Sequence, residues 1–322
     1  MLIVTNYTAF PSRWRAACGT EGETVIARGL AEFHRHARRR DAVFVINGDA
    51  HTVMALAFAR MAIPGFDRPL VAIDLIFRRP SGLKGRLAHL VKRPLLARAD
   101  LYINFFADAR GVGAVYGIPP ERCSYVPFKV NLDIAQVAHV LPTEEFVLCF
   151  GRSMRDYDTF FDAMARLPHP AAIADVNPAD LAQHGARFTR RLEDLPANVC
   201  VLDDDGSSEA QLDMLRRAKL VVIPVRKASF VASGISTALN AMMVGKCVIG
   251  TEGPGMTDIF TEEILAVPPE DPAALAAMID RAWNDDALRR RVSDTGRRCA
   301  ERLGGEDALV QRLIDRIADT YG

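Results

Sequence analysis

The stretch Val221–Asn240, VVIPVRKASFVASGISTALN, decides the fold class. An apolar run ends in proline, a polar loop with Arg226 and Lys227 follows, and Gly234 opens an amphipathic pattern. This order predicts a buried strand, a turn and a helix, which is the repeating unit of parallel α/β sheets. Because N–H groups at a helix start favour anions, the stretch is also a candidate phosphate site, to which Ser236 adds a hydroxyl. An ordinary capped helix beside a solvated basic loop would have the same pattern.

The same order recurs along both halves of the chain. We predict strands at Leu2–Thr5, Ala42–Ile46, Leu70–Ile73, Leu101–Asn104, Cys123–Val126, Phe146–Phe150, Ala171–Ala174, Val199–Leu202, Leu220–Pro224 and Cys247–Thr251. We predict helices at Glu23–Arg38, His51–Met61, Asp108–Tyr116, Asp156–Arg166, Ser208–Arg217, Gly234–Val244 and Pro272–Asn284, with two more in Asp286–Tyr321. Two consecutive Rossmann-like, doubly wound units are the simplest α/β fold with this order.

A polar break at Val137–Glu145 divides the chain. We predict an N-terminal domain over residues 1–140, a C-terminal domain over residues 141–304, and a final helix, 305–322, that packs back on the N-terminal domain. Open α/β sheets bind ligands outside the carboxyl ends of their strands. The default site is therefore a cleft across which the two domains face each other.

Composition narrows the function classes. Forty basic and forty acidic residues in 322 argue against a general nucleic-acid binder, although residues 1–145 have six excess basic residues and residues 146–322 six excess acidic ones. The six cysteines are far apart and form no metal-ligand pattern, so we expect mostly buried, reduced thiols of a cytoplasmic protein and no metal. We expect no signal peptide and no membrane span.

A second strand-turn-helix pattern, Phe146–Met164 (FVLCFGRSMRDYDTFFDAM), adds phosphate chemistry. Gly151 would let the backbone approach a ligand closely, and Arg152 and Arg155 at the strand's carboxyl end could hold a diphosphate. Alternatively, Asp156 simply caps the helix and both arginines are solvated. A third strand-end loop, Gly250–Asp258 (GTEGPGMTD), either admits a sugar or turns the chain.

From Phe146 to about Ala300 the chain resembles the donor domain of family 4 GT-B glycosyltransferases. The resemblance is carried by GRSMRDYDTFFDAM, AKLVVIPV, ASGISTALNAMMVGKCVIGTEGPGMTD and VPPEDPAALAAMIDRAWNDDALRRRV. The first half resembles the acceptor domain more loosely, through AVFVINGD and ADLYIN…YGIPPERCSYVPF. The implied fold is GT-B, with two Rossmann-like domains.

The resemblance implies a hexosyltransferase-like enzyme. It would move a sugar, with retention, from a nucleotide-diphospho-sugar to a glycan or lipid-linked acceptor in cell-surface polysaccharide or glycoconjugate synthesis. The base and ribose would lie against Val201–Glu209 and Asn240, and the sugar would face Thr251–Gly255. No cofactor or metal would be needed. The implied donor residues are Gly151, Arg152, Ser153, Arg155, Asp203, Glu209, Lys227, Ser233, Gly234, Ile235, Ser236, Asn240, Thr251 and Gly253.

The chain departs from the family pattern at three positions. Ala232 and Asn240 occupy the places of two glutamates, and Ile73 precedes Asp74 where a histidine is usual. Asn240 could still hydrogen-bond a ribose hydroxyl, whereas Ala232 offers no polar side chain. These departures keep open a second hypothesis: a catalytically impaired GT-B protein that binds nucleotides.

The candidate acceptor and catalytic residues lie in the first half. Ala17–Leu30, ACGTEGETVIARGL, resembles a glycine-rich acceptor loop followed by a helix, with Gly19, Gly22 and Glu23 as candidates. A plain loop with Glu23 in the helix's first turn is equally compatible with it. Strand-end placement makes Asp49, His51 and Asp74 the candidate acids and bases.

The segment Arg78–Arg98 has seven basic residues, no acidic residue and interleaved leucines. It predicts either a helix that contacts an anionic lipid surface, on the inner face of the membrane, or a solvated basic helix packed on the sheet. Pro94 would interrupt such a helix.

Overall fold

The computed structural model describes residues 1–64, 66–132, 137 and 144–322, which form two compact α/β units. Unit 1 comprises Met1–Pro127 and Asp307–Gly322, and unit 2 comprises Phe128–Glu306. The chain therefore enters unit 2 before the predicted break, most of which falls outside the described residues. The last helix, α11 (Glu306–Tyr321), belongs almost entirely to unit 1.

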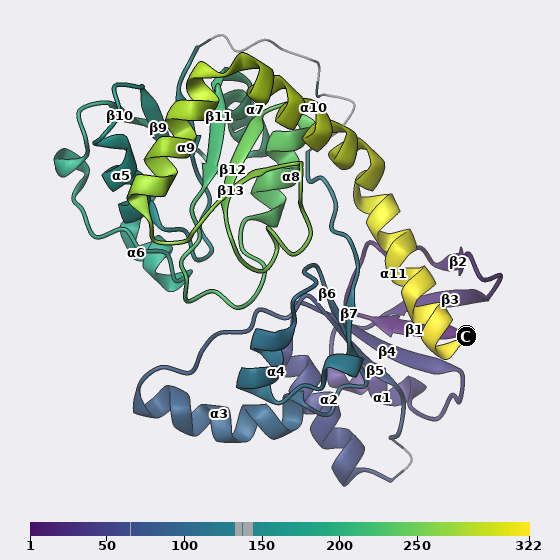
Figure 1. The fold of residues 1–322 in the computed structure, drawn as a ribbon. Coiled ribbons are helices and arrows are strands. Elements are labelled where there is room, and N and C mark those ends of the chain that lie inside the picture. Colours follow the sequence, from purple (N-terminus) through teal and green to yellow (C-terminus); the bar gives the residue numbers. More distant parts are fainter. Residues whose placement is uncertain (65, 133–136, 138–143) are drawn as a thin grey trace. The chain divides into compact units, whose positions relative to one another are not determined.

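Unit 1 is built on a seven-stranded sheet in the order β2-β3-β1-β4-β5-β6-β7, in which only β2 runs antiparallel to its neighbour (Figure 1). Its strands are β1 (Leu2–Thr5), β2 (Arg13–Arg15), β3 (Glu21–Ile26), β4 (Ala42–Asn47), β5 (Leu70–Ile73), β6 (Leu101–Asn104) and β7 (Cys123–Tyr125). Its helices, besides α11, are α1 (Leu30–His36), α2 (Ala50–Ala62), α3 (Gly82–Leu96) and α4 (Arg110–Tyr116).

The predicted helix Glu23–Arg38 is wrong in its first part. Glu21–Ile26 is strand β3, which pairs parallel with β1 and antiparallel with β2, and helix α1 begins only at Leu30. The close packing of β2 on β3 needs Gly22, because a Cβ there would lie 2.2 Å from the ring of Trp14. A strand near a sheet edge contains both polar and apolar residues and has no continuous apolar run. Its sequence pattern can therefore be taken for that of an amphipathic helix.

Unit 2 has a six-stranded, fully parallel sheet in the order β10-β9-β8-β11-β12-β13. Its strands are β8 (Val147–Cys149), β9 (Ala171–Ala174), β10 (Val199–Leu202), β11 (Leu220–Ile223), β12 (Cys247–Thr251) and β13 (Leu265–Val267). Its helices are α5 (Tyr157–Met164), α6 (Pro178–Gln183), α7 (Ser208–Arg217), α8 (Ile235–Met243), α9 (Pro272–Asn284) and α10 (Asp286–Leu303). The strand order reverses between β8 and β11, which makes this pair the topological switch point.

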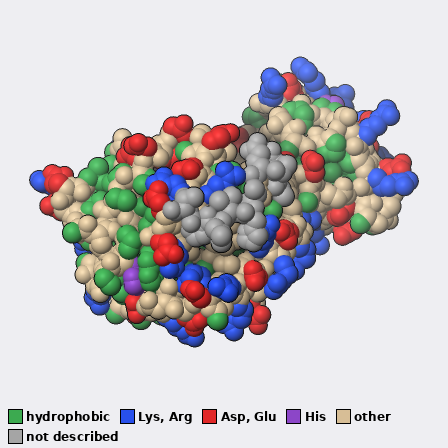
Figure 2. All heavy atoms as spheres, turned by 90° about the horizontal axis from the view of Figure 1, so that it is seen from above, with side chains coloured by type: hydrophobic (Ala, Val, Ile, Leu, Met, Phe, Trp, Pro, Cys, Tyr) green, Lys and Arg blue, Asp and Glu red, His purple; other side chains and the backbone are tan. Residues whose placement is uncertain are grey.

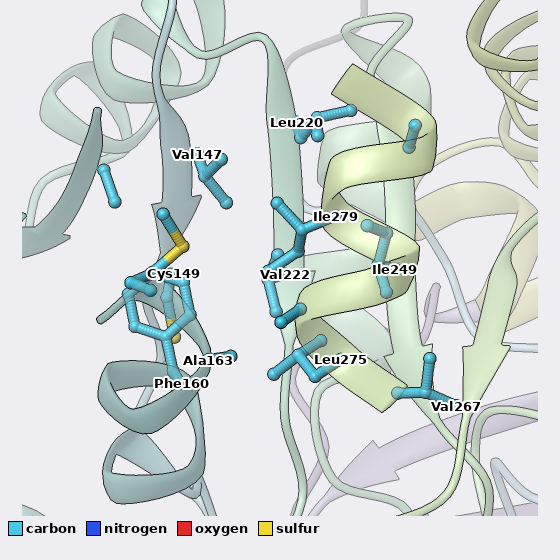
Figure 3. Packing of buried hydrophobic residues seen from close by; sticks show 14 of the residues in the cluster. Val147, Cys149, Phe160, Ala163, Leu220, Val222, Ile249, Val267, Leu275 and Ile279 are labelled. Atoms are coloured by element: carbon cyan, nitrogen blue, oxygen red, sulfur yellow. The ribbon is translucent and has the colours of Figure 1, made fainter. Parts of the chain in front are cut away.

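The core of unit 2 holds the switch-point strands rigidly. Figure 3 shows Val147 of β8, Val222 of β11 and Ile249 of β12 beside Phe160 of α5 and Ile279 of α9, and all five side chains are fully buried. Burying each such side chain contributes about 1.5–3 kcal/mol. The loops that leave these strands therefore start from fixed points.

The surface has charged side chains of both signs. On the face shown in Figure 2, basic and acidic side chains are interspersed, which is typical of a solvated surface. Within the described residues, no helix is long and apolar enough to cross a membrane. Only Cys149, Cys247 and Cys299 are buried, so the expectation of mostly buried cysteines holds for three of the six.

Candidate functional site

A cavity of about 540 Å³, here called cavity A, lies at the carboxyl edge of the unit 2 sheet. Its walls come from the ends of β8, β9 and β10 and from the first turn of α8. The polar walls include Gly151, Arg152, Asp175, Asp204, Ser236 and Thr237, and Val176 and Leu181 add apolar surface. This volume is typical of small-molecule sites, and the position at the switch point is where doubly wound sheets bind ligands.

Arg155 lies directly behind the wall of cavity A. Its side chain is 1% exposed; Nε donates to Phe150 O at 2.9 Å, and Nη2 donates to Thr237 Oγ1 at 3.4 Å. Nη1 has no hydrogen-bond partner among the described residues. Burial lowers the pKa of Arg155, but a guanidinium stays charged. Arg155 is therefore neither solvated nor part of the wall of cavity A: its charge lies beneath that wall.

Two glycines make room for this buried guanidinium. Gly151 has φ +106° and Gly234 has φ +91°, both in the left-handed region that glycine tolerates. A Cβ on Gly151 would lie 2.3 Å from Arg155 Nη2, and one on Gly234 would lie 2.8 Å from Nη1. Gly234 is also the N-cap of α8, so the start of this helix lies directly over the buried charge.

Arg152 is the exposed cation of cavity A. Its side chain is 58% exposed, and its Nε lies 3.7 Å from Asp180 Oδ2. Such an exposed, loose ion pair contributes little stability. The guanidinium is therefore available to a ligand anion, as the sequence predicts.

Asn131 forms hydrogen bonds with two residues of α8 that lie one turn apart. Its Nδ2 donates to Ser236 Oγ at 2.5 Å, and its backbone N–H donates to Asn240 Oδ1 at 2.9 Å. Asn240 is only 3% exposed. Asn240 is therefore buried, with its oxygen bound to the protein's own backbone, and its contact with a ribose stays a prediction.

A smaller cavity of about 190 Å³, cavity B, lies at the ends of β11 and β12. It is lined by Lys227, Thr251 and Gly253, all predicted donor residues. Thr251 is buried and its Oγ1 accepts the N–H of Val225 at 2.9 Å, so it fixes the loop. Exposed Lys227 makes no ion pair among the described residues and presents its charge to this cavity.

Residues 142–299, which contain both cavities, match the family Glycosyl transferases group 1. This half of the chain is a glycosyltransferase domain of that family.

Solved structures of other proteins share the fold of the chain. HepE of Anabaena in complex with UDP and glucose has a TM-score of 0.65 at 15% identity, covering 92% of this chain and 86% of HepE. Sucrose-phosphate synthase of Thermosynechococcus elongatus has a TM-score of 0.65 at 18% identity, covering 100% and 88%. The lipopolysaccharide outer core galactosyltransferase WaaB has a TM-score of 0.63 at 14% identity, covering 93% and 84%. The fold is thus GT-B, as predicted. No curated protein matches the chain in sequence.

The other predicted donor residues of the glycosyltransferase domain do not line cavity A. Ser153, Asp203 and Glu209 are exposed, and Asp204, the neighbour of Asp203, lines the cavity instead. Ser233 and Ile235 are buried on either side of Gly234 and hold the start of α8. Their contribution is to the shape of the loop.

The catalytic candidates follow neighbouring strands of unit 1. Asp49 caps α2, accepting the N–H groups of His51 and Thr52 at 2.9 and 3.1 Å and the Thr52 hydroxyl at 2.5 Å. Burial acts to raise the pKa of Asp49, but these hydrogen bonds outweigh it and lower the pKa. Asp49 is therefore a structural cap and a poor proton acceptor.

His51 and Asp74 are the accessible members of this group. The His51 side chain is 87% exposed, and Asp74 follows β5 with φ +48°. The Asp74 side chain reaches water, and desolvation by surrounding protein atoms raises its pKa to about 6. Asp74 and His51 remain the better acid and base candidates.

The predicted acceptor residues lie at the other edge of the unit 1 sheet. Glu23 pairs with Leu2 at the start of β1, Gly22 pairs with Trp14, and Gly19 lies in the turn of the β2–β3 hairpin. The expected loop before a helix is a hairpin at the amino ends of the strands. Gly19, Gly22 and Glu23 are thus placed away from the carboxyl edge, where α/β sheets bind ligands.

The basic segment forms α3, which continues past Pro94 to Leu96, so the predicted interruption is not present. Leu83, Leu87, Leu90 and Val91 are 56–76% exposed, and in α3 only Leu96 is buried. These leucines are thus exposed, and both alternatives, contact with a lipid surface and a solvated basic helix, stay predictions.

Sequence reasoning missed three residues that shape cavity A: Asn131, Asp175 and Thr237. Asp175 could have been found, because it follows a predicted strand, as Asp204 does within the predicted segment Val201–Glu209. Asn131 could not, because its contact with Ser236 spans 105 residues.

Proposed function

We propose that the protein transfers a sugar from a nucleotide-diphospho-sugar, with retention, to a glycan or lipid-linked acceptor. The observation that carries this proposal is the buried Arg155, which has no acidic partner among the described residues and lies under the N-terminus of α8. An unpaired buried cation is costly for the fold, so an anionic ligand that compensates it is favoured. HepE, which shares the fold, was solved with UDP and with UDP-glucose.

The same residues stabilise a departing diphosphate. Arg155 supplies charge from below, Arg152 supplies it at the cavity wall, and the first N–H groups of α8 point toward the anion. These donors are fixed before the reaction, so no reorganisation is needed as negative charge develops. In this proposal the leaving group needs no metal ion, and Asp74 and His51 act on the acceptor side.

A thermal-shift screen with UDP, GDP, ADP and dTDP tests the proposal. At one hundred times its Kd, a ligand should stabilise the protein by about 2.7 kcal/mol, which is several degrees in Tm. Arg152→Ala should weaken the best nucleotide about tenfold or more, because charge-assisted contacts contribute about 1.5–3 kcal/mol. If none of the four nucleotides shifts the wild-type Tm, the proposed donor class is wrong.

Cavity B is the proposed place of the sugar. Lys227→Ala should then weaken the nucleotide-sugar about tenfold while leaving the affinity of the bare nucleoside diphosphate unchanged. An equal loss for both ligands would place Lys227 at the phosphates instead.

A catalytically impaired nucleotide-binding protein remains the second candidate, because Ala232 and Asn240 replace two family glutamates and Asn240 is buried. Hydrolysis of the nucleotide-sugar whose nucleotide binds best separates the two. Slow release of free sugar, lost in Asp74→Asn, favours the enzyme; binding without any turnover, with or without added acceptors, favours the second candidate.

We further propose that α3 rests on an anionic membrane surface, where a lipid-linked acceptor would be met. The exposed leucines provide apolar insertion, and each nearby Lys or Arg adds about 1 kcal/mol.

Changing Lys84, Arg86, Lys92 and Arg93 to glutamate should abolish sedimentation with anionic vesicles and leave nucleotide binding intact. Electrostatic attachment should also fade between 0.1 and 1 M salt, where the Debye length falls from about 10 to about 3 Å. Wild-type protein that ignores such vesicles at low salt would contradict a membrane role.

A further inference from the structure

Unit 1 has its own cavity at the carboxyl edge of its sheet, here called cavity C, with a volume of about 260 Å³. It is bounded by the start of α2, by the chain after β5 and by α3, all of which lie together in Figure 1. Its ionisable lining residues are Arg78, Arg79, Lys92, His51 and His89, and none of the described lining residues is acidic.

Among the described residues, two of the cations that line cavity C are not paired with a carboxylate. Arg78 and Lys92 make no ion pair in the part of the chain that the structure describes, and both are exposed. Asp49 lies 4.0 Å from His51 Nδ1, but its carboxylate is occupied by the first turn of α2. Arg78 and Lys92 alone give cavity C a charge of about +2 at neutral pH.

The start of α3 adds to this positive potential. Ser81, the N-cap of this 15-residue helix, makes no side-chain cap hydrogen bond. Both Ser81 and Gly85 line cavity C, so the first N–H groups of α3 lie at its wall. Unsatisfied N–H groups and the helix dipole favour an anion there.

The base of cavity C is apolar and its size is limited. Phe77, Tyr116 and Leu96 are buried lining residues, and Met54 of α2 lies beside them. A volume of about 260 Å³ is below the usual range for a whole drug-sized ligand, roughly 300–1,000 Å³. It fits a charged head group better than a complete acceptor.

We infer that cavity C binds the phosphate-bearing end of the acceptor, a phosphate monoester or a diphosphate. Arginine forks match phosphate oxygens with two parallel hydrogen bonds, and Lys92 adds a point charge. His51 lines the same cavity and is one of the accessible acid and base candidates, so a phosphate held here brings the acceptor beside them. The inference rests on the proposed function, because it names the acceptor class of that reaction.

The test compares two double variants with equal loss of charge. Arg78→Gln/Lys92→Gln removes two cations of cavity C, and Lys84→Gln/Arg86→Gln removes two cations of α3 that do not line it. The probes are dihexanoyl phosphatidic acid below its micelle concentration, glucose 1-phosphate, and dihexanoyl phosphatidylcholine as a zwitterionic control. Calorimetric titration measures the affinity of each.

We expect the first double variant to bind phosphatidic acid or glucose 1-phosphate about a hundredfold more weakly, because it removes two charge-assisted contacts that are worth roughly tenfold each. The second should bind as the wild type does, and phosphatidylcholine should bind to none of them. Tighter binding of phosphatidic acid points to a lipid-borne phosphate, and tighter binding of glucose 1-phosphate points to a soluble phosphorylated acceptor.

Equal affinity of the wild type and the first variant, or no phosphate binding to the wild type, would overturn the inference. UDP, GDP, ADP and dTDP affinities, measured on the same samples, show whether each variant is folded. These affinities also distinguish a failure of the proposed function from a failure of the inference. A wild-type protein that binds none of the four nucleotides contradicts the proposed function. A wild-type protein that binds a nucleotide but no phosphate probe contradicts only the role of cavity C.

Discussion

Replacing Arg155 by methionine should separate binding from stability. The substitution removes one buried positive charge while keeping an unbranched apolar side chain. At roughly 7 Å and an effective dielectric constant of about 20, one unit charge attracts a phosphate by about 2.4 kcal/mol. The affinity for a nucleoside diphosphate should therefore fall about 50-fold.

The stability of the free protein should hardly change. The variant loses the hydrogen bond from Nε to Phe150 O, worth about 1 kcal/mol, but it also removes a buried Nη1 without a partner, which costs about 1–3 kcal/mol. We expect the Tm to stay within about 3 °C of the wild type.

Arg187→Met is the matched control for this substitution. Arg187 pairs with the buried carboxylate of Asp156 at 2.7 Å, so its loss leaves Asp156 without a cation and should cost about 3–5 kcal/mol. Calorimetric titration and thermal unfolding measure both variants. If Arg155→Met binds nucleotide as the wild type does but unfolds much earlier, then Arg155 is a structural residue and the electrostatic argument is refuted.

Three other predictions concern residues of unit 2. Gly234→Ala should lower the free energy of unfolding by about 2–4 kcal/mol, because the φ of Gly234 is +91° and a Cβ there would lie 2.6 Å from Ile223 Cγ2. The control Gly305→Ala, with open space around it, should not lower the Tm. An unchanged Tm in Gly234→Ala would contradict the tight packing. Asn131→Ala should weaken nucleotide binding about threefold, because Asn131 orients the Ser236 hydroxyl. The same substitution should have no effect in a Ser236→Ala background, and the control Asn284→Ala should bind as the wild type does. Additive losses in the double variant would show that Asn131 does not act through Ser236. Burial lowers the pKa of Lys246 to about 8 from an unfolded value near 10.5, so folding is penalised below pH 8 and the penalty is relieved as the pH rises toward 10.5; urea unfolding should show this gain in the wild type and not in Lys246→Met.

The buried strands could be predicted from the sequence because both of their faces are covered. Leu70–Ile73 and Ala171–Ala174, for example, have the predicted bounds and are buried throughout. β3 could not be predicted in this way, since none of its residues is fully buried and its first half, Glu-Gly-Glu, contains no apolar run. β13 is only three residues long, which is too short for a pattern to be recognised.

The residues that line the candidate site at the strand ends could be predicted from the sequence. The buried residues behind the cavity wall could not. Gly151, Arg152 and Ser236 line cavity A because each follows a strand or begins a helix. The burial of Arg155 and Asn240 could not be predicted, because a polar residue beside a strand end or on a helix gives no sign of which side it faces. Asn131 comes from a distant part of the sequence, and only the folded chain brings it to α8.

The central claim is that cavity A holds the nucleotide diphosphate of a sugar donor. A crystal structure of the protein with its best-binding nucleoside diphosphate tests this most directly. Our account predicts phosphate oxygens within hydrogen-bond distance of the first N–H groups of α8 and of Arg152, with Arg155 beneath them. Phosphates bound away from the switch point between β8 and β11, with cavity A empty of ligand, would contradict it.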